Sequence, residues 1–308
     1  MNVQNPSASR GIVIQAVDLV KNYGTGSNMV HALRGVNVSF ERGKFTAIMG
    51  PSGSGKSTLM HTLAGLDSAT SGHILFGGAD LTRMDDKQLT LLRRHKIGFI
   101  FQSFNLLPMF TAEQNILMPL TLAGDKPDRA WFDLLVETLG LKQRLNHRPN
   151  ELSGGQQQRV AIARALITKP KLVFADEPTG NLDSVSSAEV LGFLKRSVNE
   201  LGQTIVMVTH DAVAASYADR AIVFSDGRIV ADEQHPNAEV MNELLMAERE
   251  RTTRTTLTDT PADQMAQMAG VRNVPDLPIT DAPLPPAVPT SGCEGTLRHA
   301  RAAARHAR

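Results

Sequence analysis

The chain has 308 residues, and its 42% hydrophobic content is enough for one large domain or two modest ones with a packed core. Its 32 Lys and Arg against 31 Asp and Glu give a formal charge of +1, so no overall basic field favours nucleic acid, which is not expected as a partner. The single cysteine, Cys293, excludes an internal disulfide and a zinc site built from cysteines.

Neither the opening residues nor the long apolar segments predict export or membrane insertion. The start, MNVQNPSASRGIVIQAVDLV, lacks a basic flank followed by a long apolar run, so no signal peptide is expected. The longest nearly uncharged stretch, residues 97–124, is interrupted by polar residues and prolines, whereas a spanning helix needs about 20 predominantly apolar residues. We therefore expect a cytoplasmic chain that reaches a membrane only through a partner.

Residues 11–246 alternate short apolar runs with helical patterns, which predicts an α/β domain. The runs IVIQAVDLVKNY and HALRGVNVSFERG predict alternating edge strands of an antiparallel flank. FTAIMG, KIGFIFQ, KLVFADEP and TIVMVTHD are short and continuously apolar, which predicts buried parallel strands. AIVFSDGRIVADE predicts a hairpin around Asp226-Gly227. A helix-rich insert at about 103–168 is expected to form a second lobe.

The two ends of the chain differ from this pattern. Residues 1–10 are expected to be a flexible N-terminus. Residues 247–308 lack aromatic side chains, and prolines crowd the part from 275 to 289, which predicts a disordered tail. Its basic end, RHARAAARHAR, indicates a frayed terminus, with contact to anionic lipid as the alternative.

Residues 50–58, GPSGSGKST, fit the phosphate-binding pattern G-x-x-x-x-G-K-[ST] and lie between an apolar run and a helical pattern, as the motif requires. Glycines let backbone N–H groups turn toward phosphate oxygens, and the helix N-terminus adds partial positive charge. We expect Lys56 to bridge phosphates and Ser57 to ligate Mg²⁺. The alternative is a glycine-rich turn with a chance lysine. The predicted nucleotide-binding residues are Gly50, Pro51, Ser52, Gly53, Ser54, Gly55, Lys56, Ser57 and Thr58.

Polar side chains follow three of the predicted buried strands. Asp176 and Glu177 end KLVFADEP, Gln102 follows IGFIF, and His210 follows TIVMVT. The carboxyl ends of parallel strands form the ligand-binding edge of an α/β sheet, so these residues should converge there. Asp176 could hold the Mg²⁺ shell opposite Ser57, and Glu177 could act as general base. His210 could hydrogen-bond the γ-phosphate and hold the attacking water, and Gln102 could reach Mg²⁺ or that water. Taken singly, Gln102 and His210 would be ordinary polar residues at strand ends. The alternative for the adjacent acids is helix capping.

The turn NELSGGQ, before the helical pattern QQRVAIARAL, carries no catalytic group. Ser153 with Gln156 predicts a capping box, and Gly154 and Gly155 allow close backbone approach to an anion. Alone, this turn indicates a well-capped helix. Tyr23, in VKNYGTG, could stack on an adenine, with ordinary packing as the alternative.

The order GPSGSGKST, Gln102, LSGGQ, VFADEP, GNLD and TH resembles the nucleotide-binding subunits of ABC transporters over residues 11–246. FIFQSFNLLPMFTAEQNI and ADEPTGNLDS are most similar to the MacB and LolD type, whose ATPase chains serve FtsX-like permeases. The resemblance implies a P-loop NTPase fold with a mostly parallel core sheet, an antiparallel N-terminal β subdomain and a helical subdomain. It also implies ATP and Mg²⁺ as cofactors.

The resemblance further implies a second ATPase subunit, expected to be another copy of this chain, and a separate membrane permease that holds the chain at the inner face of the membrane. It assigns adenine stacking to Tyr23, catalysis to Glu177, His210 and Gln102, and metal binding to Ser57, Gln102 and Asp176. In head-to-tail pairs, the residues that face the other subunit's ATP are Ser153, Gly154, Gly155, Gln156 and Asp183.

The expected function is ATP hydrolysis that drives an exporter or a membrane-extraction system. One alternative is an FtsE-like ATPase that gates a membrane complex without transport. A soluble ABC-type ATPase acting on DNA or ribosomes is disfavoured, because the sequence has one cassette and no heptad array.

Overall fold

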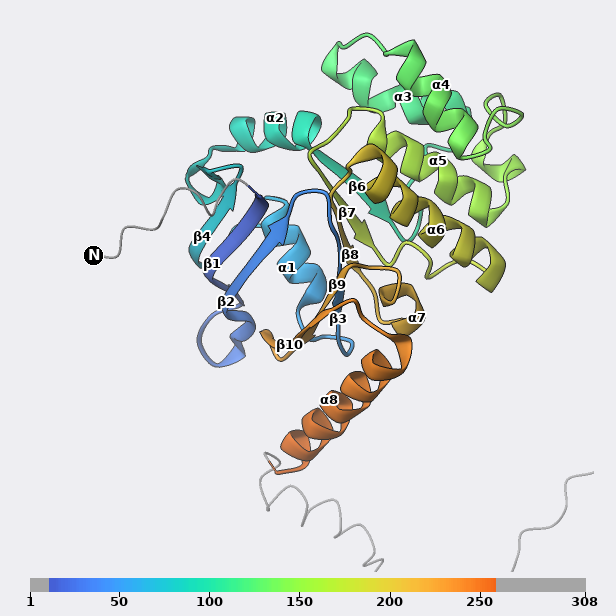
Figure 1. Cartoon of the computed structure of the whole chain (residues 1–308). Coiled ribbons are helices and arrows are strands. Elements are labelled where there is room, and N and C mark those ends of the chain that lie inside the picture. Colours follow the sequence, from blue (N-terminus) through green and yellow to red (C-terminus); the bar gives the residue numbers. More distant parts are fainter. Residues whose placement is uncertain (1–10, 259–308) are drawn as a thin grey trace, which may run out of the picture. The chain divides into compact units, whose positions relative to one another are not determined.

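Two β-sheets organise residues 11–258, the part of the chain that the structure, a computed structural model, describes (Figure 1). The first is antiparallel, with strand order β2-β1-β4-β5. The second has the order β10-β9-β3-β8-β7-β6. Residues 1–10, predicted as a flexible terminus, lie outside the described part. The strands are β1 (Ile12–Tyr23), β2 (Val30–Glu41), β3 (Phe45–Met49), β4 (Ser71–Phe76), β5 (Ala79–Asp80), β6 (Ile97–Phe101), β7 (Leu172–Asp176), β8 (Ile205–Val208), β9 (Arg220–Ser225) and β10 (Arg228–Gln234).

Strand β1 lies inside the first sheet, because it pairs with β2 on one side and with β4 on the other. The prediction that both opening strands are edge strands is therefore wrong for β1. Side-chain alternation along a strand indicates which face is buried, but it carries no information on how many strands its backbone pairs with. The second partner, Ser71–Phe76, comes from a segment on the far side of the phosphate-binding motif.

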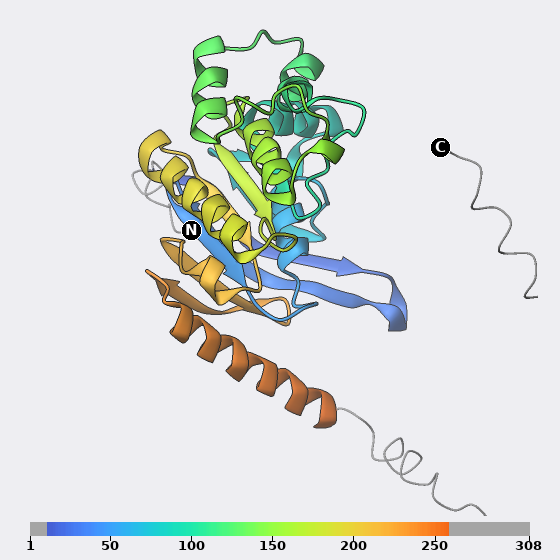
Figure 2. The ribbon, with the colours of Figure 1, turned by 90° about the vertical axis from the view of Figure 1, so that its right-hand side faces the viewer.

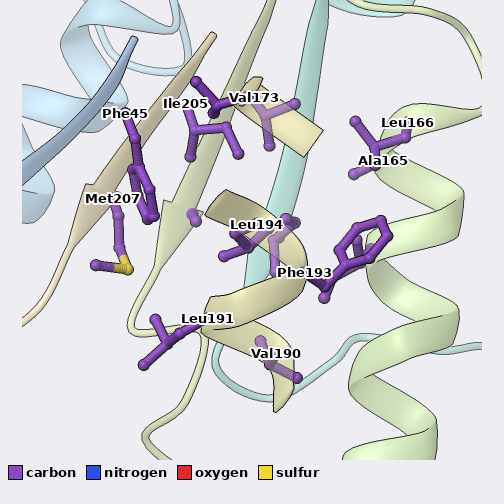
Figure 3. Packing of buried hydrophobic residues seen from close by; sticks show 14 of the residues in the cluster. Phe45, Ala165, Leu166, Val173, Val190, Leu191, Phe193, Leu194, Ile205 and Met207 are labelled. Carbon is purple, nitrogen blue, oxygen red and sulfur yellow. The ribbon is translucent and has the colours of Figure 1, made fainter. Parts of the chain in front are cut away.

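The core of the second sheet is parallel, which confirms the prediction for β3, β6, β7 and β8. A parallel strand covered on both faces favours apolar residues at nearly every position. Phe45 of β3 and Met207 of β8 belong to one buried cluster, whereas Ile48, which points to the opposite face of β3, belongs to the other. Figure 3 shows Phe45 and Met207 on the side of the sheet that faces Leu191 and Leu194 of α6.

The predicted hairpin around Asp226-Gly227 is also confirmed. Strand β9 runs parallel to β3, and β10 returns antiparallel to β9. Asp226 and Gly227 have φ values of 48° and 74°, the left-handed conformation that a tight two-residue hairpin turn needs at both positions.

Helices cover both sheets and form a separate group at one end. The segment predicted as a helical insert contains α3, α4 and α5, and Figures 1 and 2 show α3 and α4 at the opposite end from α8. No helix within residues 11–258 is long and apolar enough to cross a membrane. The α-helices are α1 (Lys56–Leu63), α2 (Asp86–Lys96), α3 (Ala112–Ala123), α4 (Arg129–Thr138), α5 (Gly154–Leu166), α6 (Ser184–Leu201), α7 (Ala212–Ala215) and α8 (Ala238–Thr258), and the 3₁₀ turns are η2 (Gly26–Asn28), η3 (Leu81–Arg83) and η4 (Pro149–Glu151).

Helix α8 corrects the predicted start of the disordered tail. The helix continues through residues 247–258, which were predicted to be disordered. Its first turns are fixed by Met241 and Leu245, which are buried in the core cluster, and helix propagation from a fixed start is favourable. Glu248 and Arg251, one turn apart, form an ion pair at 2.8 Å. The rest of the predicted tail, 259–308, lies outside the described residues.

Candidate functional site

A cleft of about 920 Å³ lies at the carboxyl ends of the core strands. The strand order places β3, β8 and β7 side by side, so the loops that follow them meet at one edge of the sheet. The structure thereby brings together the predicted residues Tyr23, Glu177 and His210 with most of the phosphate-binding motif. The residues lining the cleft are Tyr23, Met29, Val30, His31, Ala32, Arg34, Ser52, Gly53, Ser54, Gly55, Lys56, Ser57, Thr58, Glu177, His210, Asp226, Gly227 and Arg249.

Two glycines of the phosphate loop hold conformations that other residues would not fit. Gly50 has φ 149°, and a Cβ there would overlap the carbonyl oxygen of Phe224. Gly55 has φ 103°, and a Cβ would lie 2.5 Å from the carbonyl oxygen of Ala32. Gly55 is the N-cap of α1 and gives no side-chain cap, so the first-turn N–H groups of the helix stay available to an anion.

The Lys56 ammonium lies inside this loop. It donates hydrogen bonds to the carbonyl oxygens of Gly50 at 2.9 Å and Pro51 at 2.6 Å. Burial lowers the pKa of Lys56, and the charges of Glu177 and Asp176 oppose that shift. A desolvated ammonium interacts strongly with phosphate oxygens, because water screens its charge little.

The two acids after β7 have different surroundings. Burial raises the pKa of Asp176, and the nearby His61 and Lys56 oppose the shift. Glu177 has φ 47°, an uncommon conformation for a residue with a side chain. Its two carboxylate oxygens lie 2.8 and 2.9 Å from Nδ1 of His210. Neither acid is the N-cap of a helix in the described part of the chain, so the capping alternative is not supported.

Replacing the half-buried Asp176 should stabilise the chain without nucleotide at neutral pH. The folded-state pKa of Asp176 lies above its ordinary value of 3.8, so its contribution to stability is present at low pH and lost as pH rises through the folded pKa. Asp176→Asn removes this loss of stability, because the amide does not ionise as the pH rises. Its Tm should exceed that of the parent by on the order of a few °C at pH 7.5, and the difference should shrink as the pH falls toward about 4.

Thermal unfolding of both proteins without nucleotide, measured across that pH range, checks this prediction. Asp133→Asn, at an exposed position of α4, is the control and should show no such pH-dependent gain. A lower Tm for Asp176→Asn at neutral pH would show that the carboxylate is stabilising rather than strained.

Gln102 follows β6, whose last residue pairs with Asp176. Gln102 itself is not one of the residues that line the cleft in the described part of the chain. Its amide contacts Asn181 instead. The Gln102 side chain donates to Oδ1 of Asn181 at 3.4 Å, and the Asn181 amide donates to the backbone carbonyl of Gln102 at 2.9 Å. Gly180 makes room for the contact, since a Cβ there would lie 2.6 Å from Nε2 of Gln102. Sequence reasoning did not identify Asn181, although it lies inside the quoted GNLD.

The turn Ser153–Gln156 does not belong to the cleft-lining set of the described chain. The predicted capping box is confirmed: Ser153 Oγ accepts from the Gln156 N–H at 3.3 Å, and Gln156 Oε1 accepts from the Ser153 N–H at 3.0 Å. Ser153 is exposed. Gly155 has an internal reason to be glycine, because a Cβ would meet Oγ of Ser186 at 2.8 Å. Gly154 has only ordinary contacts, the nearest at 3.5 Å.

Asp183 is likewise exposed and does not line the cleft formed by the described residues. It is the N-cap of α6, and its Oδ1 accepts from the N–H groups of Val185 and Ser186 at 3.0 and 2.9 Å. Hydrogen bonds from Ser186, first from its backbone and then from its side chain, are the main causes that lower the pKa of Asp183. The carboxylate is therefore held ionised at the surface.

Several cleft residues were not predicted. Met29 precedes β2, and Val30, His31 and Arg34 lie at its start. Of these, His31 and Arg34 belong to the run predicted only as an alternating strand. Arg249 lines the cleft from α8, in the segment predicted to be disordered. Neither group carries a local motif, so the sequence offered no direct means of finding them.

Comparison with known proteins agrees with this architecture. A family model described as "ABC transporter" matches residues 33–180. The lipoprotein-releasing system ATP-binding protein LolD of Geobacter metallireducens is 49% identical over 222 residues, which cover 71% of this chain and 99% of that protein. The bacitracin export ATP-binding protein BceA of Halalkalibacterium halodurans is 44% identical over 219 residues, covering 70% of this chain and 87% of the relative.

A longer relative and a solved structure complete the comparison. The macrolide export ATP-binding/permease protein MacB of Syntrophobacter fumaroxidans is 49% identical over 221 residues, which cover 70% of this chain but only 31% of MacB. A dimeric ATP-binding cassette in a post-hydrolysis state, bound to ADP and Pi, superposes with a TM-score of 0.66 at 40% identity, covering 73% of this chain and 99% of the other. The chain therefore belongs to the ATP-binding, ATP-hydrolysing subunits of ABC transporters, in the group with LolD, MacB and BceA.

Proposed function

We propose that two copies of this chain bind MgATP head to tail, so that the Ser153–Gln156 turn of each copy closes the cleft of the other. The observation that carries the proposal is the separation within one copy: the phosphate loop, Glu177 and His210 share a cleft, whereas the exposed turn and Asp183 lie outside it. The turn starts a helix, which favours an anion near its N-terminus. The related cassette bound to ADP and Pi is dimeric. Sedimentation with and without MgATP tests the pairing.

For hydrolysis, we propose that Glu177 is the general base and that His210 orients it. The carboxylate borders the cleft on the same side as the phosphate loop, where it could polarise a water for in-line attack on the γ-phosphate. The contacts to Nδ1 of His210 would hold the carboxylate in place. Lys56 and the partner's turn would neutralise charge that develops on the phosphate oxygens.

The residues present suit Mg²⁺. Ser57 and Asp176 offer hydroxyl and carboxylate oxygens, the hard donors that Mg²⁺ prefers, and it typically needs only one or two carboxylates beside substrate phosphates. Gln102, whose amide nitrogen donates to Asn181, would offer its amide oxygen. When bound, Mg²⁺ would supply neutralising charge to the β- and γ-phosphate oxygens. The raised pKa of Asp176 fits this role, because a cation would compensate the desolvation of this half-buried carboxylate.

We further propose that the chain couples to a membrane permease through an apolar groove of about 450 Å³ bordered by α2, β6, α3 and α5. Leu122 is 67% exposed there, beside Met118, Pro119 and Phe101. Arg93 and Arg94 add positive charge, so the occupant we infer is a short apolar permease segment with an acidic residue. MacB, whose name joins ATP-binding and permease functions, supports a partner of this type. Such docking would hold the chain at the inner face of the membrane.

A charge placed in the groove should separate coupling from chemistry. Leu122→Glu should cut co-purification with the cognate permease by roughly 10-fold or more, because a carboxylate in an apolar interface loses hydration. ATP turnover of the isolated chain should remain near that of the parent. Leu134→Glu, at an exposed leucine of α4 outside the groove, is the matched control and should leave permease binding intact. Equal binding of the permease by both variants would show that the permease contacts another surface of the chain.

The work driven by this ATPase is proposed to be export or extraction of molecules from the membrane. The names of the relatives specify lipoprotein release, macrolide export and bacitracin export. Substrate transport can be measured after reconstitution with the cognate permease, using the parent chain and the Glu177→Gln chain in parallel. Transport by the parent that is lost with Glu177→Gln would support ATP-driven transport, whereas no transport by either would support ATP-gated signalling.

A further inference from the structure

The Tyr23 ring is held by two side chains that no motif includes. Its hydroxyl donates to Oδ2 of Asp67 at 2.6 Å. The other oxygen of Asp67 accepts from the Lys21 ammonium, also at 2.6 Å. That ammonium lies over the Tyr23 ring, 4.8 Å from its centroid. Lys21 and Tyr23 are two positions apart on β1 and thus project from the same face of the strand.

This arrangement leaves one part of the ring free. Lys21 is 7% exposed and also donates to the carbonyl oxygen of Ser68 at 2.7 Å, so it is fixed beneath the ring. Tyr23 itself is 42% exposed and lines the cleft. A ring that is covered on one face by a cation and open to the cleft offers its remaining face to a planar base.

Asp67 also ties the ring to the phosphate loop. It lies just after α1, where its N–H donates to the carbonyl oxygen of His61 at 3.3 Å. Burial raises the pKa of the Tyr23 hydroxyl, the hydrogen bond to Asp67 adds to that rise, and Thr58 at the start of the same helix opposes it. Burial would raise the pKa of Asp67, but hydrogen bonds from Lys21 and Tyr23 lower it, so the carboxylate stays ionised. Through Asp67, the ring is therefore joined to the end of the helix that follows the loop.

We propose that Asp67, together with Lys21, is a positioning residue for nucleotide binding: it fixes the Tyr23 ring at a set orientation and distance from the phosphate loop, ready for the base. The inference rests on the proposed role of Tyr23 as the base platform. A pre-oriented ring avoids the entropy that a mobile side chain loses on binding, so the benefit falls on affinity. Because the base lies away from the reacting phosphate, the turnover rate at saturation depends little on it.

The test compares ADP affinity, by calorimetry, for the parent, Asp67→Ala, Tyr23→Phe, the double variant and Tyr23→Ala. Asp67→Ala should raise Kd roughly 5-fold, a part of the about 5- to 150-fold that a whole base–aromatic stack contributes. KM for ATP should rise by a similar factor, with kcat falling less than about 2-fold. Tyr23→Phe removes the same hydrogen bond by deleting its donor and should raise Kd by a similar factor. The double variant should then be no weaker than either single variant.

A matched control exists elsewhere in the fold. Lys169 pairs with Asp128 at 2.8 Å and lies over the Trp131 ring, 5.4 Å from its centroid, outside the cleft. Asp128→Ala breaks this similar cluster and should leave ADP affinity unchanged. A spectroscopic readout completes the test: with Tyr217→Phe leaving Tyr23 as the one titrating tyrosine, Asp67→Ala should lower the tyrosine pKa.

The outcomes separate the two proposals. Parent-like ADP binding by Tyr23→Ala would remove Tyr23 as the base platform, and with it the ground for this inference. A weakened Tyr23→Ala beside parent-like Asp67→Ala and Tyr23→Phe would overturn the positioning role alone. Additive losses in the double variant would show that Asp67 acts by another route.

Discussion

Glu177→Gln is expected to bind MgATP about as tightly as the parent and to lose turnover by a factor on the order of 10²–10⁴. The amide keeps the size and the hydrogen-bonding capacity of the side chain but cannot accept a proton. Glu177 already lies at the cleft wall, with its carboxylate oxygens 2.8 and 2.9 Å from His210 Nδ1. Because hydrolysis no longer separates the pair, ATP should accumulate in a stable dimer.

Phosphate release, nucleotide affinity and sedimentation with MgATP give the three required readouts. Glu189→Gln, on the exposed side of α6 where the acid pairs with Arg159 at 3.8 Å, serves as the matched control and should turn over normally. Parent-like turnover in Glu177→Gln would remove this residue from the role of base, whatever the dimer does.

Ser153→Arg is expected to leave ATP binding to a single copy within about 2-fold of the parent, while ATP-driven pairing is abolished and turnover falls on the order of 10²-fold or more. The Ser153 side chain is exposed and does not line the described cleft, so its replacement should not disturb the bound nucleotide of its own chain. In the proposed dimer, a long side chain at this turn would occupy the space of the partner's phosphates.

The substitution also removes a helix cap, which costs about 1 kcal/mol, so a control for stability is needed. Thr111 provides it, because it starts α3 with the same kind of capping box, formed with Gln114. Thr111→Arg should lose comparable stability but keep pairing and turnover. Sedimentation and phosphate release on both variants decide the matter: a Ser153→Arg chain that still dimerises with ATP and turns over would contradict the head-to-tail site.

The site holds several unfavourable features that a bound nucleotide would relieve. Burial raises the pKa of Asp176 and lowers that of Lys56, which means that both charged forms are held away from water. Glu177 adds a left-handed backbone conformation. These costs lie where phosphate and Mg²⁺ would compensate them, so the stability gained on binding MgATP should exceed what contact area alone provides.

Local patterns in the sequence were enough to predict most strands of the core sheet. Continuous apolar runs predicted the parallel strands, since a strand buried on both faces favours apolar residues at nearly every position. Asp226-Gly227 predicted its hairpin, and Ser153 with Gln156 predicted its capping box. In each case the residues that determine the structure lie close together in the sequence, so a local sequence pattern is enough to predict it.

What the tertiary structure alone decided involves segments that are far apart in the chain. The position of β1 between two strands, the contact of Gln102 with Asn181, and the link from Tyr23 through Asp67 to Lys21 depend on backbone pairing and loop placement. Helix α8 persists past its predicted end because its first turns are buried against distant elements. Such contacts depend on the spatial order of the strands, which short-range propensity and hydrophobic period do not encode.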